Sequence, residues 1–170
     1  MSADLFILIK NDFDDIKDLA KSSIYGNSVK YNLEKQLGKE AINDFICSTD
    51  EEGLAFVSLK LEPYCVTLTL RNGFWIVYNG NHHRDLIDDY KCRFPISETA
   101  QKVAMLFGEK EVWYTCDISM EQYECTISLE ELISEMQNKD CYAEFNRSEL
   151  LKIASSKRPL YSLYHELFEM

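Results

Sequence analysis

The residues around position 85 hold the strongest grouping of side chains that could bind a metal ion. His82 and His83 are adjacent, and aspartates follow at positions 85, 88 and 89. In a helix these three aspartates would share one face, where carboxylates and an imidazole could act together as ligands. Adjacent histidines, however, cannot both point the same way from a regular element, and an asparagine-rich surface turn accounts for the segment without a metal. The sequence therefore predicts neither a metal site nor a cofactor.

A thiol nucleophile is the second chemical possibility in the same region. Cys92 could attack a substrate with His82 or His83 as its base and Asp85 as the group that orients the base. No small residues or strained turn surround the cysteine, and the GxSxG, HExxH and glycine-rich phosphate-loop motifs are absent. A structural cysteine is the better interpretation, and we expect no enzyme. A catalytic site assembled around these residues is kept as an alternative function.

The charge of the chain is concentrated in one stretch that also contains aromatic residues. Residues 111–144 hold nine acidic side chains and one basic one, a net charge of −8, whereas the other 136 residues hold 20 acidic and 17 basic ones, a net charge of −3. Such a surface suits docking on a basic macromolecule, because charge steers the encounter and aromatic rings supply buried area. A solvated face on a soluble protein is the plainer interpretation of the same pattern.

We predict that this stretch forms a partner-binding surface. Acidic side chains and two aromatic anchors make it up: Trp113, Asp117, Glu121, Tyr123, Glu124, Glu130, Glu131 and Glu135. An alternative is DNA mimicry, in which carboxylates stand in for phosphates and block a nucleic-acid-binding protein. Mimicry would require carboxylates along an extended surface with little aromatic anchoring, and the aromatic content disfavours it.

Length and composition limit the remaining possibilities. A chain of 170 residues with 46% hydrophobic residues predicts one globular domain spanning 1–170. The net charge of −11 disfavours nucleic acid and anionic membranes as partners and favours a basic protein. No run approaches 18 apolar residues, and the first ten residues do not resemble a signal peptide. The six cysteines contain no CxxC pair. We therefore expect a cytoplasmic protein with reduced thiols.

The local patterns predict an antiparallel sheet. A strand is expected over residues 5–9, and alternating apolar residues predict strands over 54–61 and 64–71. Asn72 and Gly73 both tolerate a positive φ and predict a two-residue hairpin turn that pairs Leu70 with Trp75. Further strands are expected over 112–116, 123–127 and 141–145. In the hairpin, one face should be uniformly apolar and turn toward helices: Val66, Leu68, Leu70, Trp75 and Val77.

Helices are predicted between these strands. Asn11 and Ser28 are candidate caps of two early helices separated by a break at 26–28. Gly38 either ends the second helix or lies inside it, in which case an apolar face continues at 41–46. A later helix is expected over 96–107 with Ser97 as its cap. Ser128 and Glu131 form a capping box that opens another helix. After one more helix beginning near 146, the segment 160–168 is expected to be helical and to pack His165.

The element order predicts an α+β fold, an antiparallel sheet with a central hairpin packed against helices, mainly on one face. In general character the chain resembles bacterial immunity proteins, which are small, soluble and often acidic inhibitors of toxins. That resemblance implies a cytosolic inhibitor that neutralises a basic partner, such as a toxin domain, by covering its functional site.

Overall fold

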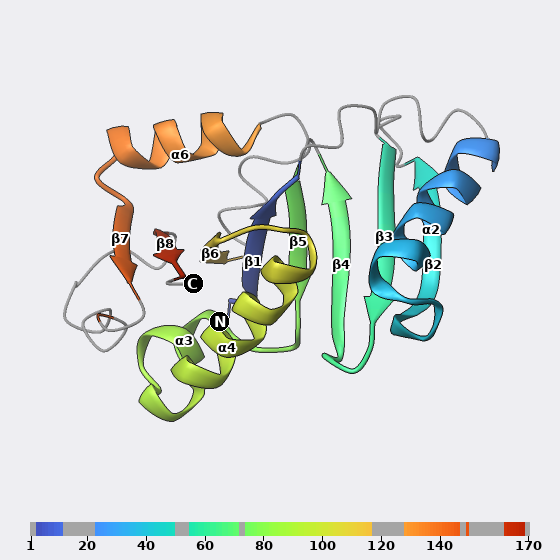
Figure 1. Ribbon diagram of the computed structural model, residues 1–170. Coiled ribbons are helices and arrows are strands. Elements are labelled where there is room, and N and C mark those ends of the chain that lie inside the picture. Colours follow the sequence, from blue (N-terminus) through green and yellow to red (C-terminus); the bar gives the residue numbers. More distant parts are fainter. Residues whose placement is uncertain are drawn as a thin grey trace.

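The computed structural model describes residues 3–11, 23–49, 55–71, 74–116, 128–146, 149 and 162–168. These residues form a mixed α/β fold built on one eight-stranded sheet, with four α-helices and a short 3-10 helix (Figure 1). The strands are β1 (Leu5–Lys10), β2 (Ile42–Thr49), β3 (Ala55–Leu61), β4 (Val66–Arg71), β5 (Phe74–Tyr78), β6 (Glu111–Cys116), β7 (Tyr142–Asn146) and β8 (Leu163–Leu167). The helices are α2 (Ser23–Leu37), η1 (Lys39–Ala41), α3 (His83–Ile87), α4 (Tyr90–Leu106) and α6 (Leu129–Asn138).

The sheet has the order β2-β3-β4-β5-β1-β6-β8-β7. Every neighbouring pair is antiparallel except β7 and β8, which are parallel. The predicted antiparallel sheet is thus present, with one parallel pair at its edge. β8 lies between β6 and β7, although it follows both in the chain.

The pairing of β4 with β5 has the register that the sequence predicts. Leu70 faces Trp75, and Arg71 faces Phe74. Because side chains alternate between the two faces of a strand, this register places the five apolar residues of the two strands together, and all of them are buried. Asn72 and Gly73, the predicted turn, lie outside the described residues.

The larger hydrophobic core lies between one face of the sheet and α2, α3 and α4. Leu33 of α2, Leu86 of α3 and Val103 of α4 meet strand residues such as Leu68 and Trp75 in it. Figure 1 shows α2 and α4 crossing this face. The core explains why the alternating strands 55–61 and 66–71 have one uniformly apolar side.

A smaller core lies on the opposite face. Leu8, Phe74 and Trp113 of the sheet meet Leu132 and Met136 of α6. In Figure 1, α6 lies near the ends of β6, β7 and β8, away from α2. Among the described helices, α2, α3 and α4 therefore cover one face of the sheet, and α6 covers part of the other.

Two expectations for residues 26–46 are wrong. Helix α2 runs without interruption through Gly26, Asn27 and Ser28, so the predicted break is absent. Residues 42–46 belong to strand β2 and do not continue a helix. Gly38, with φ of 89°, follows the last residue of α2 in a conformation that favours glycine, so it ends that helix, and η1 then leads into the strand.

Two further expectations are corrected later in the chain. Helix α4 begins at Tyr90 with Asp89 as its cap, so Ser97 is a buried helix residue and not a cap. The segment predicted to be the last helix contains strand β8. The other early helix, the strand expected over 123–127 and the helix expected to begin near 146 fall mainly outside the described residues.

Candidate partner-binding surface

Helix α6 is held against the sheet by its apolar side, and a capping box closes its first turn. Leu129, Leu132 and Met136 are buried against the smaller core. At the start of the helix, the Ser128 hydroxyl accepts a hydrogen bond from the Glu131 backbone N–H (3.2 Å), and the Glu131 carboxylate accepts one from the Ser128 N–H (2.8 Å). The predicted capping box is confirmed, and it defines where the helix begins.

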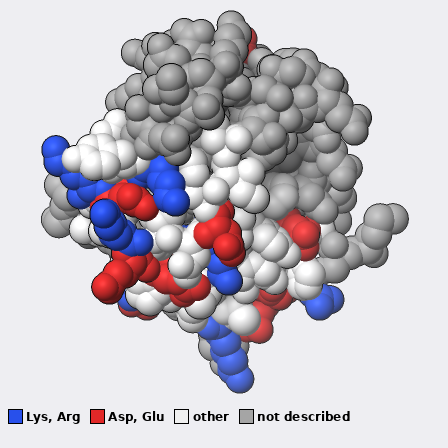
Figure 2. All heavy atoms as spheres, turned by 90° about the vertical axis from the view of Figure 1, so that its right-hand side faces the viewer, with Lys and Arg blue, Asp and Glu red and all other residues white. Residues whose placement is uncertain are grey.

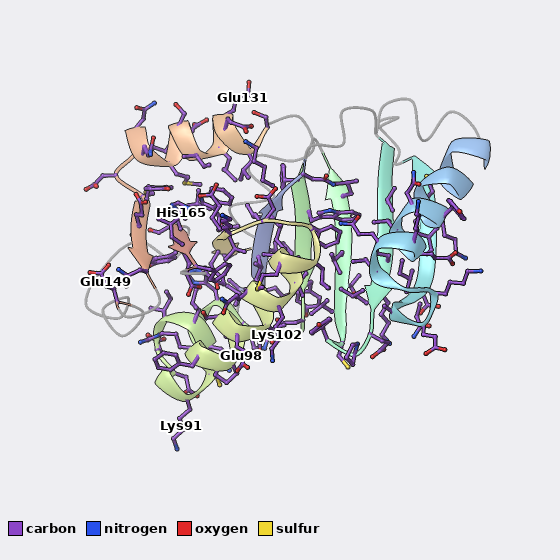
Figure 3. The ribbon with its side chains drawn as sticks, in the orientation of Figure 1. Lys91, Glu98, Lys102, Glu131, Glu149 and His165 are labelled. Carbon is purple, nitrogen blue, oxygen red and sulfur yellow. The ribbon has the colours of Figure 1, made fainter. Side chains whose placement is uncertain are left out.

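The side of α6 that faces away from the sheet is acidic. Glu130 and Glu131 are exposed and Glu135 is half-buried, and Figure 3 shows Glu131 pointing away from the sheet. Residues 128–146 hold five acidic side chains and one basic one. Carboxylates in the first turn also stabilise the positive end of the helix dipole, so Glu130 and Glu131 have a structural role besides any role in binding.

Two of these carboxylates have lysine partners. Lys10 of β1 lies 3.4 Å from Glu130, and Lys139 lies 2.8 Å from Glu135 one helical turn away. All four side chains are at least two-fifths exposed, so solvent screens both pairs and each contributes at most about 1 kcal/mol. Such pairs can exchange for a partner's cation at low cost, although they reduce the local negative charge.

The predicted aromatic anchor Trp113 is not on the surface. Its side chain is 4% exposed, and its ring stacks on His165 of β8 with centroids 4.8 Å apart. The indole therefore packs within the smaller core beneath α6, and its ring is not accessible to a partner. The remaining predicted surface residues, Asp117, Glu121, Tyr123 and Glu124, lie outside the described residues.

The structure adds a cluster that the sequence does not suggest. His165 is 6% exposed and lies between two carboxylates, with Nε2 2.8 Å from Glu111 and Nδ1 3.6 Å from Glu144. Figure 3 places His165 among β6, β7 and β8 on the side of the molecule that carries α6. Both carboxylates belong to the acidic stretch. The three residues are far apart in the chain, and only strand pairing brings them together.

Tyr142 of β7 borders this cluster. Its ring centroid is 6.1 Å from that of His165. Burial raises the pKa of the Tyr142 phenol, and the Glu144 and Glu111 carboxylates raise it further. Tyr142 is thus a neutral, partly buried aromatic side chain beside two partly exposed carboxylates. It can take the place that Trp113 was expected to have as an aromatic neighbour of the acidic surface.

Other parts of the surface have a different charge pattern. Figure 2 shows basic and acidic side chains interleaved on the side that lies at the right of Figure 1, where α2 and β2 are. On the helices of the larger core, Lys30 pairs with Glu34 (4.0 Å) and Lys102 with Glu98 (2.9 Å). This interleaving is typical of a solvated face, and it contrasts with the outward side of α6.

The residues considered for catalysis are engaged in structural contacts. Asp85 accepts a hydrogen bond from the His82 backbone N–H (2.7 Å) at the start of α3, and His82 Nδ1 lies 3.3 Å from Asp4. His83 is 1% exposed beside the ring of Tyr164. In the part of the chain that the structure describes, no group of three or more His, Cys, Asp or Glu side chains is placed to hold a metal ion.

Cys92 is held in its thiol form. Its Sγ donates a hydrogen bond to the Asp89 carboxylate at 3.3 Å. This bond is the main reason that the pKa of Cys92 is raised, and burial and the charges of Asp89 and Asp85 add to it. A nucleophilic cysteine needs the opposite shift. The contact argues against the thiol mechanism considered from the sequence.

We predict that Asp89→Asn makes Cys92 more reactive. Asparagine keeps the cap of α4 but removes the charge, so the thiol pKa should fall toward its ordinary value. At a pH of about 8, where a larger thiolate fraction means faster attack, the rate of alkylation by iodoacetamide should rise several-fold. Peptide mass spectrometry measures this rate, with exposed Cys65 as the internal reference. Faster alkylation of Cys92 than of Cys65 in the unaltered protein would contradict the assignment.

Comparison with known proteins found no match: no family model, curated protein or solved structure matches the chain. Each helix within the described residues is too short or too polar to cross a lipid bilayer.

Proposed function

We propose that this protein is an acidic cytosolic inhibitor of the immunity-protein type. It would bind a basic protein partner, such as a toxin domain, and cover the functional site of that partner. One observation carries the proposal. Helix α6 is held to the sheet by Leu129, Leu132 and Met136, and its glutamates lie on its other sides. The sheet face that α6 partly covers also carries the carboxylates of Glu111 and Glu144, which flank His165. A rigid helix with carboxylates turned outward is suited to recognise cations without reorganising.

Glu130 and Glu135 supply the charge that should attract the partner. Their side chains are partly or largely exposed, and unlike Glu131 they take no part in the capping box. Charge of this kind mainly accelerates association, and added salt weakens its effect. Binding should therefore become slower as the ionic strength rises.

The double variant Glu130→Lys/Glu135→Lys tests the proposal. A tagged protein first captures partners from its native host at low salt, and mass spectrometry identifies them. Surface plasmon resonance with the purified partner then measures association rate and affinity. We expect the affinity of the double variant to fall roughly ten-fold or more at low salt, and less at high salt.

A matched control distinguishes the effect of the charges on α6 from the effect of the protein's overall net charge. Glu40→Lys/Glu98→Lys changes the net charge by the same amount at exposed positions outside the acidic stretch. Figure 3 shows Glu98 on α4, on the side of the molecule away from Glu131. The control should retain most of the affinity. Equal losses in both double variants, or no loss in the α6 variant, would remove α6 from the interface.

A further inference from the structure

The sheet has two edge strands, and β2 is the longer of them. Among the described strands, β2 pairs only with β3 and β7 pairs only with β8, at opposite ends of the sheet (Figure 1). The outward backbone N–H and C=O groups of an edge strand can form the hydrogen bonds of one more strand. Each edge is therefore a place where another chain can extend the sheet.

The second half of β2 is the part suited to such pairing. The register with β3 is interrupted between Asn43 and Ile46, where Asp44 has φ of 52°, and it is regular from Ile46 to Thr49. A bulge bends the strand and hinders the docking of another strand beside it. Residues 46–49 follow the bulge and keep the geometry of a regular strand.

Ile46 adds an apolar contact to this half of the strand. Its side chain is 55% exposed, and it belongs to neither hydrophobic core of the described residues. Direct strand pairing aligns it with Ser58, Thr69 and Ile76, so it projects from the face that α6 covers near the other end of the sheet (Figure 1). A strand added beside β2 would cover Ile46.

The charges of the two edges differ. Residues 23–49, which contain α2 and β2, hold three basic and three acidic side chains, whereas the other 143 residues hold 15 basic and 26 acidic ones and carry the whole net charge of −11. Residues 128–146, which contain β7, hold five acidic side chains and one basic one. Two copies meeting at β7 would bring like charges together, and two copies meeting at β2 would not.

We infer that two copies of this chain pair antiparallel through residues 46–49 of β2, about a two-fold axis perpendicular to the sheet. Such an axis brings the same strand from each copy together and continues both faces of the sheet from one copy into the other. The regular part of β2 is short, so the interface is small. We therefore expect a weak dimer that forms at high protein concentration.

The helix beside β2 supports this arrangement. Lys30 of α2 lies with its Nζ 6.0 Å from the ring centroid of Phe45 in β2, and it pairs with Glu34 at 4.0 Å. The two-fold axis would bring α2 of each copy to the same face, with one such pair of opposite charges on each side. Opposite charges in this arrangement can exchange partners between the copies without adding net charge to the contact.

The dimer goes beyond the proposed function and does not depend on it. Figure 1 shows α6 near the end of the sheet opposite β2, so pairing at β2 would leave the acidic helix of each copy accessible. One dimer would therefore present two acidic helices. Failure of the dimer leaves the proposed inhibitor function to the experiment on α6, and failure of that function leaves the dimer to the measurements below.

Sedimentation velocity at protein concentrations from about 1 μM to about 1 mM tests the dimer, because this range covers the dissociation constants of weak contacts. Ile46→Lys removes the apolar contact and places two cations near the axis, so the dissociation constant should rise roughly ten-fold or more. Met105→Lys makes the same change of charge at a residue of α4 that is 57% exposed, and it should leave the dissociation constant unchanged. Circular dichroism verifies that both variants fold.

Added salt gives an independent sign. Each copy carries a net charge of −11, and salt screens the repulsion between the copies while the surface at β2 has no net charge to lose. The dimer should therefore become stronger as the ionic strength rises, whereas binding of a basic partner to α6 should become weaker. A dimer that weakens with salt would be held by ion pairs and would overturn pairing through a neutral edge.

Hydrogen exchange followed by mass spectrometry locates the contact. The amides of residues 46–49 should exchange more slowly at high than at low protein concentration, whereas those of β7, the other edge, should not change. A chain that stays monomeric at about 1 mM, equal dissociation constants for Ile46→Lys and the unaltered protein, or protection confined to β7 would overturn the inference. Protection of residues 46–49 by a different protein of the host, without a dimer, would assign the edge to that protein instead.

Discussion

Replacing Leu132 with alanine should lower the free energy of unfolding by about 2–5 kcal/mol. The side chain is fully buried between α6 and the sheet, where it meets Phe74 and Trp113 in the smaller core. Truncation removes apolar contacts and leaves a cavity that neighbouring side chains can fill only in part. Denaturant unfolding followed by circular dichroism measures the loss.

Ser134→Ala is the matched control for this prediction. Ser134 lies on the exposed side of the same helix, so its replacement should change the free energy of unfolding by less than about 0.5 kcal/mol. Because Leu132 holds the acidic helix in place, Leu132→Ala should also weaken partner binding at temperatures where the protein remains folded. A Leu132→Ala protein as stable as the control would contradict the packing of α6 on the sheet.

The second large effect is expected at a buried carboxyl group in the larger core. Glu166 of β8 is fully buried, and Ser97 of α4 donates a hydrogen bond to its Oε1 at 2.6 Å. The Tyr114 hydroxyl of β6 donates to Oε2 of the same group. Tyr114→Phe keeps the ring but leaves one carboxyl oxygen without this donor. We expect it to lower the free energy of unfolding by about 1–3 kcal/mol.

A double-mutant cycle with Ser97→Ala tests whether the two donors act on one group. If both bonds serve Glu166, the double variant should lose an amount that differs from the sum of the single losses by about 0.5–3 kcal/mol. The three variants are compared by denaturant unfolding under identical conditions. Additive losses would show that the hydroxyls contribute independently, against the shared contact.

The alternating strands could be predicted because their signals are local. In β4 the apolar residues recur at every second position, and Leu70 can be paired with Trp75 of β5 by counting from a two-residue turn. The same holds for the capping box of Ser128 and Glu131, since both partners lie within one helical turn. Patterns of this kind need no knowledge of the rest of the chain.

Strand β2 was mistaken for a helix because of an irregularity in its pairing. Its register with β3 shifts between Asn43 and Ile46, and Asp44 there has φ of 52°. The extra residues of a bulge change the spacing of the side chains that face the core. Ile42 and Phe45, three positions apart, both contact the larger core, so a bulged strand imitates the spacing of a helix.

Strand β8 was mistaken for a helix because its buried residues include polar ones. His165 and Glu166 are both buried, which removes the alternation of apolar and polar residues typical of a strand. Their partners are distant in sequence, with Glu111 beside the first and Ser97 and Tyr114 beside the second. Nothing near residue 165 in the chain indicates these contacts.

In the candidate site, too, the features with local sequence signals could be predicted and those that depend on distant contacts could not. The acidic side of α6 could be predicted from the surplus of glutamates and the position of the cap. The buried state of Trp113 and the cluster of Glu111, Glu144 and His165 could not, because they depend on how β6, β8 and β7 align. In the sequence, His82 and His83 stand out instead, because three aspartates follow them within seven residues.

The place of β8 in the sheet constrains how a growing chain can fold during translation. β7 emerges from the ribosome before β8, and among the described strands β8 is its only neighbour in the sheet, so β7 cannot pair until β8 has been synthesised. Leu163 of β8 also completes the smaller core beneath α6. Until β8 has been synthesised, the smaller core lacks Leu163. The nascent chain therefore cannot yet pack the acidic helix α6 on a complete core. The surface that we propose for partner binding should therefore form only after β8 has been synthesised.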